Sequence, residues 1–259
     1  VTKDVELRRM SPTSVKLDIH YSGICHSDIH QVRDEWSAGI FPMVPGHEMA
    51  GIVTEVGSAV TKFKVGDRIG VGVFIDSCRE CEYCLADMEN YCVKGPVPSY
   101  NGRHYDGEPA YGGYAHSTVV EERFAVHIPE NLALDIAAPL LCAGITVYTP
   151  LTHWNAGPGK KVAVLGMGGL GHLGVKIAVA LGAEVTVLGH SAKKKADALE
   201  FGAVDYLTTE ETIGKVRNRF DMILNTTSAD LNVDGLLAML RVDGALANVG
   251  LPGTRQSYN

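Results

Sequence analysis

Apolar positions in the second half of the chain fall into short runs that alternate with helical spacings. Residues 160–165 form a run typical of a buried parallel strand, residues 172–181 have helical spacing, and residues 183–188 form a second strand-like run. The alternation continues with helices expected over 192–201, 210–218 and 233–240 and strands over 203–207, 220–225 and 244–250. This order predicts an α/β domain built on a parallel sheet.

A glycine-rich turn joins the first of these strands to the first helix. Gly166-Met167-Gly168-Gly169-Leu170-Gly171 follows the strand directly. The glycines allow a tight turn and the close approach of a pyrophosphate, which binds at the helix N-terminus. The motif alone is weak evidence for nucleotide binding. A strand, turn, helix and strand in this order favour a doubly wound Rossmann sheet over a glycine-rich turn that binds nothing.

The end of the second predicted strand discriminates between nicotinamide cofactors. NAD sites place an Asp or Glu about twenty residues past the glycine turn, where it binds the ribose 2′-hydroxyl. Residues 189–195 contain no acid, and the first is Asp197. A hydroxyl and a lysine would accept a 2′-phosphate that a carboxylate would repel. We therefore favour NADP(H); the alternative is that Lys193, Lys194 and Lys195 only begin a solvated helix.

Four of the six cysteines lie within fifteen residues, as Cys78, Cys81, Cys84 and Cys92. Thiols at this spacing bind zinc well, and a four-sulfur site is closed, so we expect a structural zinc. Disulfides are less favoured because we expect no signal peptide, and an iron–sulfur cluster because the fourth cysteine follows after seven residues and no proline comes after it. Asp76, Glu80, Asn90 and Tyr91 indicate a polar surface lobe that needs such a metal.

The two other cysteines accompany polar residues that make poor core filler. Cys25 lies in Gly23-Ile24-Cys25-His26-Ser27-Asp28-Ile29-His30, Cys142 follows an apolar run, and His47 precedes Glu48. Two cysteines and one histidine form a zinc ligand set with one open position, as a catalytic site requires. The alternative is that Cys25 and Cys142 are ordinary buried thiols.

Composition limits the function classes that remain. The chain has 259 residues, of which 46% are hydrophobic and 20% charged, enough for one large domain or two ordinary ones. The 23 basic and 30 acidic residues give a net charge of −7, which argues against nucleic-acid or acidic-membrane binding. Residues 1–10 form no targeting segment, and the apolar stretch 162–183 contains Lys176 and six glycines, so we expect a cytoplasmic protein.

These motifs follow one order along nearly the whole chain. They are Cys25-His26-Ser27-Asp28-Ile29-His30, Pro45-Gly46-His47-Glu48, the four-cysteine lobe, Gly112-Gly113-Tyr114, Leu140-Leu141-Cys142-Ala143-Gly144-Ile145-Thr146 and Ala156-Gly157-Pro158-Gly159. With them the chain resembles the zinc-dependent medium-chain alcohol dehydrogenases, whose catalytic zinc has this Cys₂His ligand set. More narrowly it resembles the cinnamyl alcohol dehydrogenase-like branch, which includes bacterial NADPH-dependent aldehyde reductases.

The resemblance implies a mainly β, GroES-like catalytic domain over residues 1–143, with a zinc lobe at about 76–95, and a Rossmann NADP-binding domain over residues 144–259. Family members continue past Gly250, so we expect a C-terminally incomplete chain with a polar tail over 253–259. The start lacks Met and opens in strand-like sequence, so we expect it to be trimmed. A homodimer is expected for a full-length chain rather than for this one.

The resemblance also implies roles for single residues. Cys25, His47 and Cys142 would ligate the catalytic zinc, and Glu48 would lie beside it. Asp28 would orient His47, while Ser27 would bond the substrate oxygen and begin a proton relay to His30. The expected cofactor contacts are Gly166, Gly168, Gly169, Leu170 and Gly171 in the turn, His190, Ser191 and Lys195 at the 2′-phosphate, and Thr146, Thr227, Val249 and Gly250 near the nicotinamide half.

We therefore expect an oxidoreductase with two zinc ions per chain that transfers hydride between NADP(H) and a primary alcohol or aldehyde, with aldehyde reduction favoured. One alternative is a non-catalytic zinc- and nucleotide-binding protein, inactive through truncation. A second is an NAD-dependent polyol dehydrogenase. An acidic residue at position 190 or 191 would have favoured it, but neither position has one. A zinc-free quinone reductase of the same superfamily is disfavoured by the six cysteines.

Overall fold

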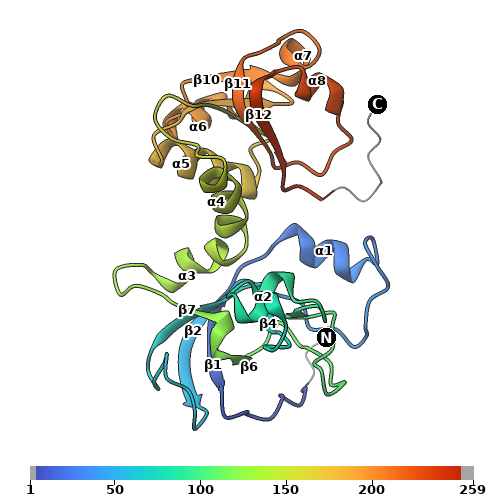
Figure 1. The fold of residues 1–259 in the computed structure, drawn as a ribbon, viewed down its shortest axis with the longest axis vertical. Coiled ribbons are helices and arrows are strands. Elements are labelled where there is room, and N and C mark those ends of the chain that lie inside the picture. The colour runs from blue at the N-terminus through green and yellow to red at the C-terminus, as the bar shows by residue number, and fades with distance from the viewer. Residues whose placement is uncertain (1–3, 252–259) are drawn as a thin grey trace. The chain divides into compact units, whose positions relative to one another are not determined.

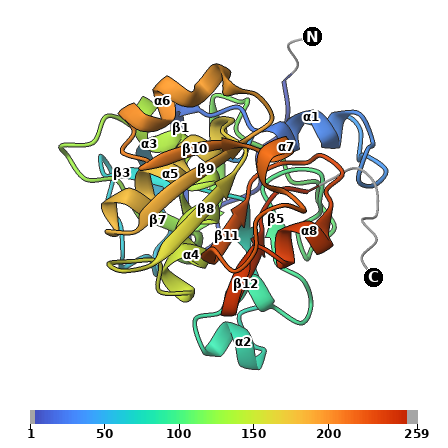
Figure 2. The same cartoon turned by 90° about the horizontal axis from the view of Figure 1, so that it is seen from above.

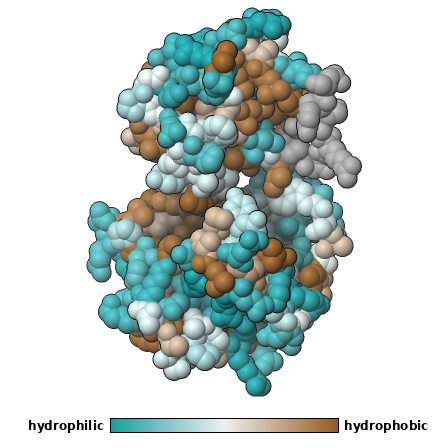
Figure 3. Space-filling model, in the orientation of Figure 1, coloured by the Kyte–Doolittle hydropathy of each residue, from teal (hydrophilic) through white to brown (hydrophobic). Residues whose placement is uncertain are grey.

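The computed structural model describes residues 4–251 (Figure 1). The chain divides into two compact units, the first ending at Cys142 and the second beginning at Ala143. Figure 3 shows hydrophilic and hydrophobic residues interspersed on the viewed face of both. No single helix in the described part is both long and apolar enough to cross a membrane; only Leu134–Leu141 and Ala143–His153, taken as one bent pair, reach that length and composition.

An antiparallel sheet of five strands forms the centre of the first unit, in the order β6-β1-β2-β3-β7. The strands are β1 Ser14–Ser22, β2 Met49–Val56, β3 Arg68–Val71, β6 Ser117–Glu121 and β7 Ala125–His127. Alternation sets the faces: Val15 and Leu17 are buried in the core, while Asp18 is exposed. Met49, Ile69 and other apolar side chains complete this core.

Shorter elements complete the first unit. They are α1 His26–Val32, β4 Phe74–Asp76, α2 Glu82–Leu85, η1 Glu89–Tyr91, β5 Val97–Pro98, η2 Glu122–Phe124, α3 Leu134–Ala137 and η3 Ala138–Leu141. One of them, α1, carries Ser27, Asp28 and His30 of the predicted site. The small β4–β5 ladder flanks the segment that contains the four closely spaced cysteines. Asp76, expected at the surface of this lobe, is instead fully buried.

The second unit contains a parallel five-stranded sheet, β10-β9-β8-β11-β12, whose strands lie side by side in Figure 2. The strands are β8 Lys161–Leu165, β9 Glu184–Gly189, β10 Asp205–Thr208, β11 Phe220–Asn225 and β12 Leu240–Asn248. Strand β8, the first of this sheet along the chain, is central, and the later strands flank it on both sides, which is the order of a Rossmann sheet. The predicted α/β fold class is confirmed.

Both faces of this sheet are covered. The connecting helices are α4 Ala143–His153, α5 Gly169–Ala180, η4 Ala192–Lys194, α6 Lys195–Glu200, α7 Thr209–Thr212 and α8 Val233–Leu237. Val162 and Val164 of β8 pack on one face in a core with residues of α4, α5 and α6. Ala163 and Leu165 pack on the other face in a core that includes Leu236 of α8. Strand β8 is thus buried on both sides, which explains its nearly continuous apolar sequence.

Several element predictions were wrong in extent. The helix expected over 172–181 begins earlier, at Gly169. The one expected over 210–218 ends at Thr212, because Ile213 is already extended, with a ψ of 122°, and Gly214 adopts a positive φ of 80°. The helix expected over 233–240 ends at Leu237, and Leu240 already belongs to β12. Residues 4–10 form no strand, and the tail over 253–259 lies outside the described residues.

Candidate functional site

Three short segments of the first unit bring the candidate metal ligands together. Cys25 immediately precedes α1, and its backbone N–H donates to Asp28 Oδ2 at 3.0 Å, which fixes the first turn of the helix. His47 and Glu48 directly precede β2, and Cys142 directly follows η3. The cysteines are 117 residues apart in sequence, so the fold of the unit, rather than local spacing, assembles this set.

The ligand atoms of Cys25, His47, Glu48 and Cys142 all lie within 4.8 Å of one another. The two sulfur atoms are 4.0 Å apart. Tetrahedral zinc with Zn–S bonds of about 2.3 Å places two sulfur ligands about 3.8 Å apart, so the set fits zinc. A Cβ added to Gly23 would lie 1.8 Å from Glu48 Oε2, so the missing side chain at position 23 leaves the room that the Glu48 carboxylate occupies.

The carboxylate of Asp28 holds this cluster in place and is only 4% exposed. Its Oδ1 accepts hydrogen bonds from the Gly46 N–H at 3.0 Å and from His47 Nδ1 at 3.1 Å. Its Oδ2 accepts from the Cys25 N–H and from the Tyr114 hydroxyl at 2.9 Å. Since Nδ1 of His47 is engaged, Nε2 is the nitrogen left for a cation, which is the usual effect of a carboxylate behind a histidine ligand.

Contacts within the cluster shift the pKa values of its members. The hydrogen bond to Cys142, helped by His47 and opposed by burial, lowers the pKa of Cys25 to about 3. Burial disfavours the charged forms of His47 and Asp28, but their mutual hydrogen bond and charge attraction, together with the contacts of each with Cys25, outweigh it, raising the His47 pKa to about 9 and lowering the Asp28 pKa to about 2. Burial and the Cys25 charge raise the pKa of Glu48 to about 7. The cluster therefore favours the thiolate at Cys25, the form that binds metal.

Two predicted proton-relay residues lie on α1, one turn apart. Ser27 Oγ is 3.5 Å from the sulfur of Cys25, at the edge of the ligand set. His30 is 8% exposed, stacks on Trp36 with ring centroids 4.6 Å apart, and contacts the Glu35 carboxylate through Nδ1. Its Nε2 is buried and has no hydrogen-bond partner among the described residues. A buried imidazole with one nitrogen held and one available suits proton transfer.

The four closely spaced cysteines form a second candidate metal site. Their ligand atoms lie within 4.8 Å of one another, and the Cys78 and Cys84 sulfurs are 3.9 Å apart, again close to the separation that tetrahedral zinc requires. Cys81 caps α2, and Cys84 follows one turn later on the same helix face. Four sulfur ligands leave no open position, so this site suits a structural ion.

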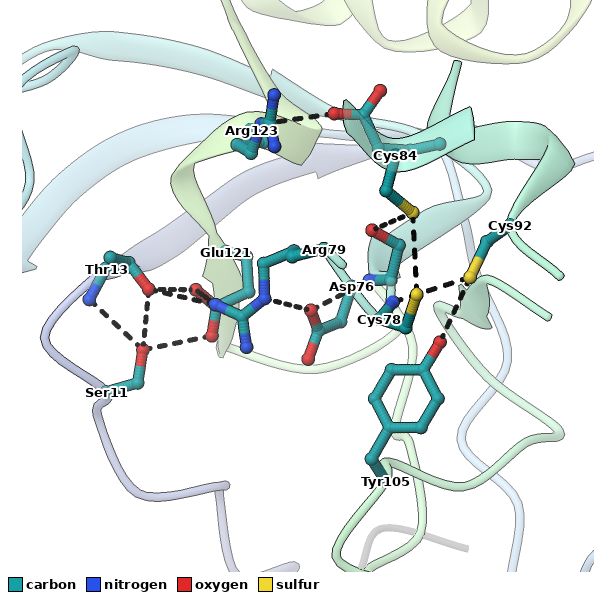
Figure 4. A network of polar contacts seen from close by, with 12 residues as sticks. Ser11, Thr13, Asp76, Cys78, Arg79, Cys84, Cys92, Tyr105, Glu121 and Arg123 are labelled. Atoms are coloured by element: carbon teal, nitrogen blue, oxygen red, sulfur yellow. Dashed lines mark hydrogen bonds and ion pairs between the residues drawn. The ribbon is translucent and has the colours of Figure 1, made fainter. Parts of the chain in front are cut away.

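A buried charge network joins this lobe to the main sheet (Figure 4). Arg79, next to Cys78, lies 3.1 Å from Glu121 on β6 and 3.6 Å from Asp76. Glu121, 1% exposed, also accepts from the hydroxyls of Ser11 at 3.0 Å and Thr13 at 2.6 Å. Both carboxylates are thus compensated by arginine and hydroxyl donors, as buried charges must be.

In the second unit the glycine turn has the geometry expected of a phosphate-binding loop. Gly166 has a φ of 85°, and a Cβ there would lie 2.4 Å from the methyl group of Thr227, so no larger residue fits. Gly168 caps α5, and neither it nor Gly169 has a neighbour that a Cβ would meet. The helix N-terminus is therefore open to an anion. Leu170 and Gly171 lie in its first turn.

Except for Thr146, the remaining predicted cofactor residues lie at or near the carboxyl ends of the strands. Thr227 donates to Asn225 Oδ1 at 2.9 Å, and the N–H groups of Val249 and Gly250 donate to the Asn225 carbonyl. The predicted 2′-phosphate residues His190, Ser191 and Lys195 follow β9 and are exposed. Thr146 lies on α4 and is half-buried.

Four residues near these sites had no role predicted from the sequence. Tyr114 bonds to Asp28, and Tyr100 stacks on His47 with ring centroids 5.8 Å apart. Glu35 holds His30, and Lys194 donates to the Met167 carbonyl in the glycine turn at 2.6 Å. The Gly112-Gly113-Tyr114 motif was a signal for Tyr114; nothing in the sequence distinguishes Tyr100, Glu35 or Lys194 from ordinary surface or core residues.

Two family models match the chain: the alcohol dehydrogenase GroES-like domain over residues 11–130 and the zinc-binding dehydrogenase domain over residues 169–259. Among curated relatives, the probable formaldehyde dehydrogenase AdhA of Bacillus subtilis is 58% identical over 98% of this chain and 74% of its own length. The NADP-dependent alcohol dehydrogenase C 1 of Mycolicibacterium smegmatis is 57% identical over 97% of this chain and 73% of its own.

Solved structures agree with this assignment. The cinnamyl alcohol dehydrogenase SbCAD4 of Sorghum bicolor has a TM-score of 0.94 at 42% identity. The match covers 98% of this chain and 74% of the sorghum chain. The enzyme named CAD from Helicobacter pylori, solved with NADP(H), has a TM-score of 0.89 at 44% identity, with 95% and 70% covered. The chain therefore belongs to the zinc-dependent medium-chain alcohol dehydrogenases, in the branch that contains the cinnamyl alcohol dehydrogenases and the NADP-dependent alcohol dehydrogenases.

Proposed function

We propose that this protein is a zinc-dependent oxidoreductase that transfers hydride between NADP(H) and a primary alcohol or aldehyde, and that it favours aldehyde reduction. The observation that carries the proposal is the convergence of Cys25, His47 and Cys142, together with Glu48, within 4.8 Å. Three such ligands leave a position for a substrate oxygen, unlike the closed four-cysteine set. The names of the relatives, NADP-dependent alcohol dehydrogenase and cinnamyl alcohol dehydrogenase, support the same substrate class and cofactor.

We assign the substrate site to the first unit, up to Cys142, and the nucleotide site to the second. Cys25, His47 and Cys142 would hold the catalytic zinc, and Cys78, Cys81, Cys84 and Cys92 a structural one, which makes two per chain. When bound, zinc would act as a Lewis acid on the substrate oxygen and the nicotinamide would supply or accept the hydride. Asp28 fixes the tautomer and orientation of His47 through Nδ1.

Proton movement falls to Ser27 and His30 in this proposal. Reduction of a carbonyl by hydride alone leaves an alkoxide, so a proton must reach the oxygen. The Ser27 hydroxyl, 3.5 Å from the Cys25 sulfur, is placed to bond an oxygen at the open position. His30 lies one turn further along α1, away from bulk water, with its Nε2 available. Glu35 holds the other nitrogen of this ring and so restricts its orientation.

The cofactor proposal rests on the segment after β9. His190, Ser191 and Lys195 are exposed there, and no carboxylate precedes Asp197. An imidazole, a hydroxyl and an ammonium group can all bond a 2′-phosphate, whereas a ribose 2′-hydroxyl would gain little from the lysine charge. The open N-terminus of α5 would take the pyrophosphate.

The test is aldehyde-dependent oxidation of NADPH, followed by its near-ultraviolet absorbance, with formaldehyde and cinnamaldehyde as substrates. We expect turnover with at least one of them and its loss in Cys25→Ala, with zinc reduced by one ion per chain and the circular dichroism unchanged. An enzyme that binds zinc and NADPH but turns over no aldehyde, and no alcohol in reverse, would support the non-catalytic alternative instead.

A further inference from the structure

A tyrosine fills the space that a side chain at the end of β9 would need. Gly189 is the last residue of β9 and pairs with Thr208 of the adjacent parallel strand β10. Tyr206 lies on β10 two residues before Thr208. A Cβ added to Gly189 would lie 1.8 Å from the Tyr206 hydroxyl oxygen and 2.5 Å from the ring carbon that bears it. Both distances are far below van der Waals contact, so position 189 accepts only glycine while Tyr206 keeps its place.

Tyr206 cannot move aside cheaply. It is 6% exposed, and its ring belongs to the core formed by β8, β9 and the helices on that face of the sheet. Its hydroxyl donates to the Ser191 carbonyl at 2.6 Å. Burial raises the pKa of Tyr206, so the hydroxyl keeps its proton and remains a donor. Displacing the ring would cost both core packing and this hydrogen bond.

Position 189 is where NAD-binding sites have the carboxylate that selects their cofactor. The carboxylate that binds the ribose 2′-hydroxyl of NAD stands at the end of the second strand, about twenty residues past the glycine turn. Gly189 occupies that place in this chain. The Tyr206–Ser191 hydrogen bond meanwhile fixes the segment whose exposed side chains, His190 and Ser191, are available for a 2′-phosphate.

We propose that Tyr206 determines cofactor specificity: its phenol excludes a carboxylate from position 189, and its hydroxyl positions the His190–Ser191 segment for a 2′-phosphate. Tyr206 acts through these neighbours and is a positioning residue. The inference rests on the proposed NADP(H) specificity and names the contact that maintains it.

The first test removes only the hydroxyl. Tyr206→Phe keeps the ring in the core but loses the bond to the Ser191 carbonyl. We expect its dissociation constant for NADPH to rise about three- to tenfold, the usual effect of one hydrogen bond, while that for NADH stays unchanged. Binding is measured by nucleotide fluorescence, and 2′,5′-ADP and 5′-AMP serve as competitors that carry only the discriminating end. Tyr21→Phe, at an exposed tyrosine of the first unit, is the matched control.

The second test compares Gly189→Asp alone with Gly189→Asp/Tyr206→Ala. The single variant should weaken NADPH binding without gaining NADH affinity, because its side chain collides with the phenol. The double variant should lower the NADPH-to-NADH preference at least tenfold further, since the carboxylate then has room. Thermal melting checks folding, and if the double variant does not fold, Tyr206→Phe decides the matter.

The outcomes distinguish failure of the proposed NADP(H) specificity from failure of the role given to Tyr206. A wild-type protein that binds NADPH no more tightly than NADH would overturn the proposed cofactor and this inference together. A wild-type preference for NADPH that persists unchanged in Tyr206→Phe would overturn the inference alone. So would a Gly189→Asp variant that gains NADH affinity with Tyr206 still in place.

Discussion

Asp28→Asn should disable the candidate zinc site although it changes only one atom. All four hydrogen bonds to this side chain come from donors: the Gly46 N–H and His47 Nδ1 at one oxygen, the Cys25 N–H and the Tyr114 hydroxyl at the other. In either orientation, an asparagine amide would direct its NH₂ group at two of these donors. The tyrosine hydroxyl can rotate, but a backbone N–H cannot, so no orientation satisfies the site.

The magnitude follows from the bonds lost. A hydrogen bond to a charged group contributes about 1.5–3 kcal/mol, and at least one is lost in either orientation, so we expect the free energy of unfolding to fall by at least about 1.5–3 kcal/mol at neutral pH. The substitution also frees His47 from its orienting partner. Loss of such a partner typically lowers metal affinity about 10- to 100-fold.

The pH dependence has a defined sign. The pKa of Asp28 is lowered from 3.8 to about 2 in the folded protein. A lowered carboxyl pKa contributes stability that is present above the unfolded pKa and lost as the pH falls through the folded one. The stability difference between wild type and Asp28→Asn should therefore narrow as the pH falls from about 4 to about 2.

The assay is urea unfolding followed by circular dichroism, together with zinc titration of the metal-free protein. Asp18→Asn is the matched control, because Asp18 is exposed on β1 and should tolerate the change with little effect. If Asp28→Asn were as stable as the control and bound zinc with wild-type affinity, the structural role given to Asp28 would be wrong.

Other substitutions test separate parts of the structure. Glu121→Ala should lower the free energy of unfolding by about 1–3 kcal/mol in urea titrations, because it leaves the Ser11 and Thr13 hydroxyls without their acceptor and removes the ion pair with Arg79. Gly23→Ala should cost about 1–3 kcal/mol in thermal melts by displacing the Glu48 carboxylate, and adding Glu48→Ala should recover most of it. Glu35→Gln should lower kcat about tenfold or more with little change in KM, because His30 loses the carboxylate that holds its Nδ1; a kcat equal to that of the wild type would contradict this.

Local spacing accounts for part of the candidate site. The four-cysteine set was visible from its spacing alone, because cysteines separated by two residues, with a fourth nearby, are typical of structural zinc sites. Strand β11 was predicted at its observed bounds, since its central residues Met222, Ile223 and Leu224 form the apolar run typical of a buried parallel strand. The extent of α7 was not predicted, because the helical spacing over 210–218 was given more weight than Gly214.

Contacts between distant segments could not be predicted from spacing. Cys25 and Cys142 are 117 residues apart, and the ligand types and the family resemblance, not their spacing, linked them. The Tyr206 contact with position 189 depends on the register of two parallel strands, and the Arg79–Glu121 pair depends on how the cysteine lobe packs against β6. Such contacts are set by three-dimensional packing, which residue patterns along the chain do not reveal.

Zinc content per chain tests the central claim most directly. The protein, purified without chelators and measured by plasma mass spectrometry, should contain two zinc ions per chain. Cys25→Ala and Cys84→Ala should each retain one, because each removes a ligand of a different site. One zinc in the wild type, or two in the Cys25→Ala variant, would contradict the assignment of Cys25, His47 and Cys142 as a metal centre.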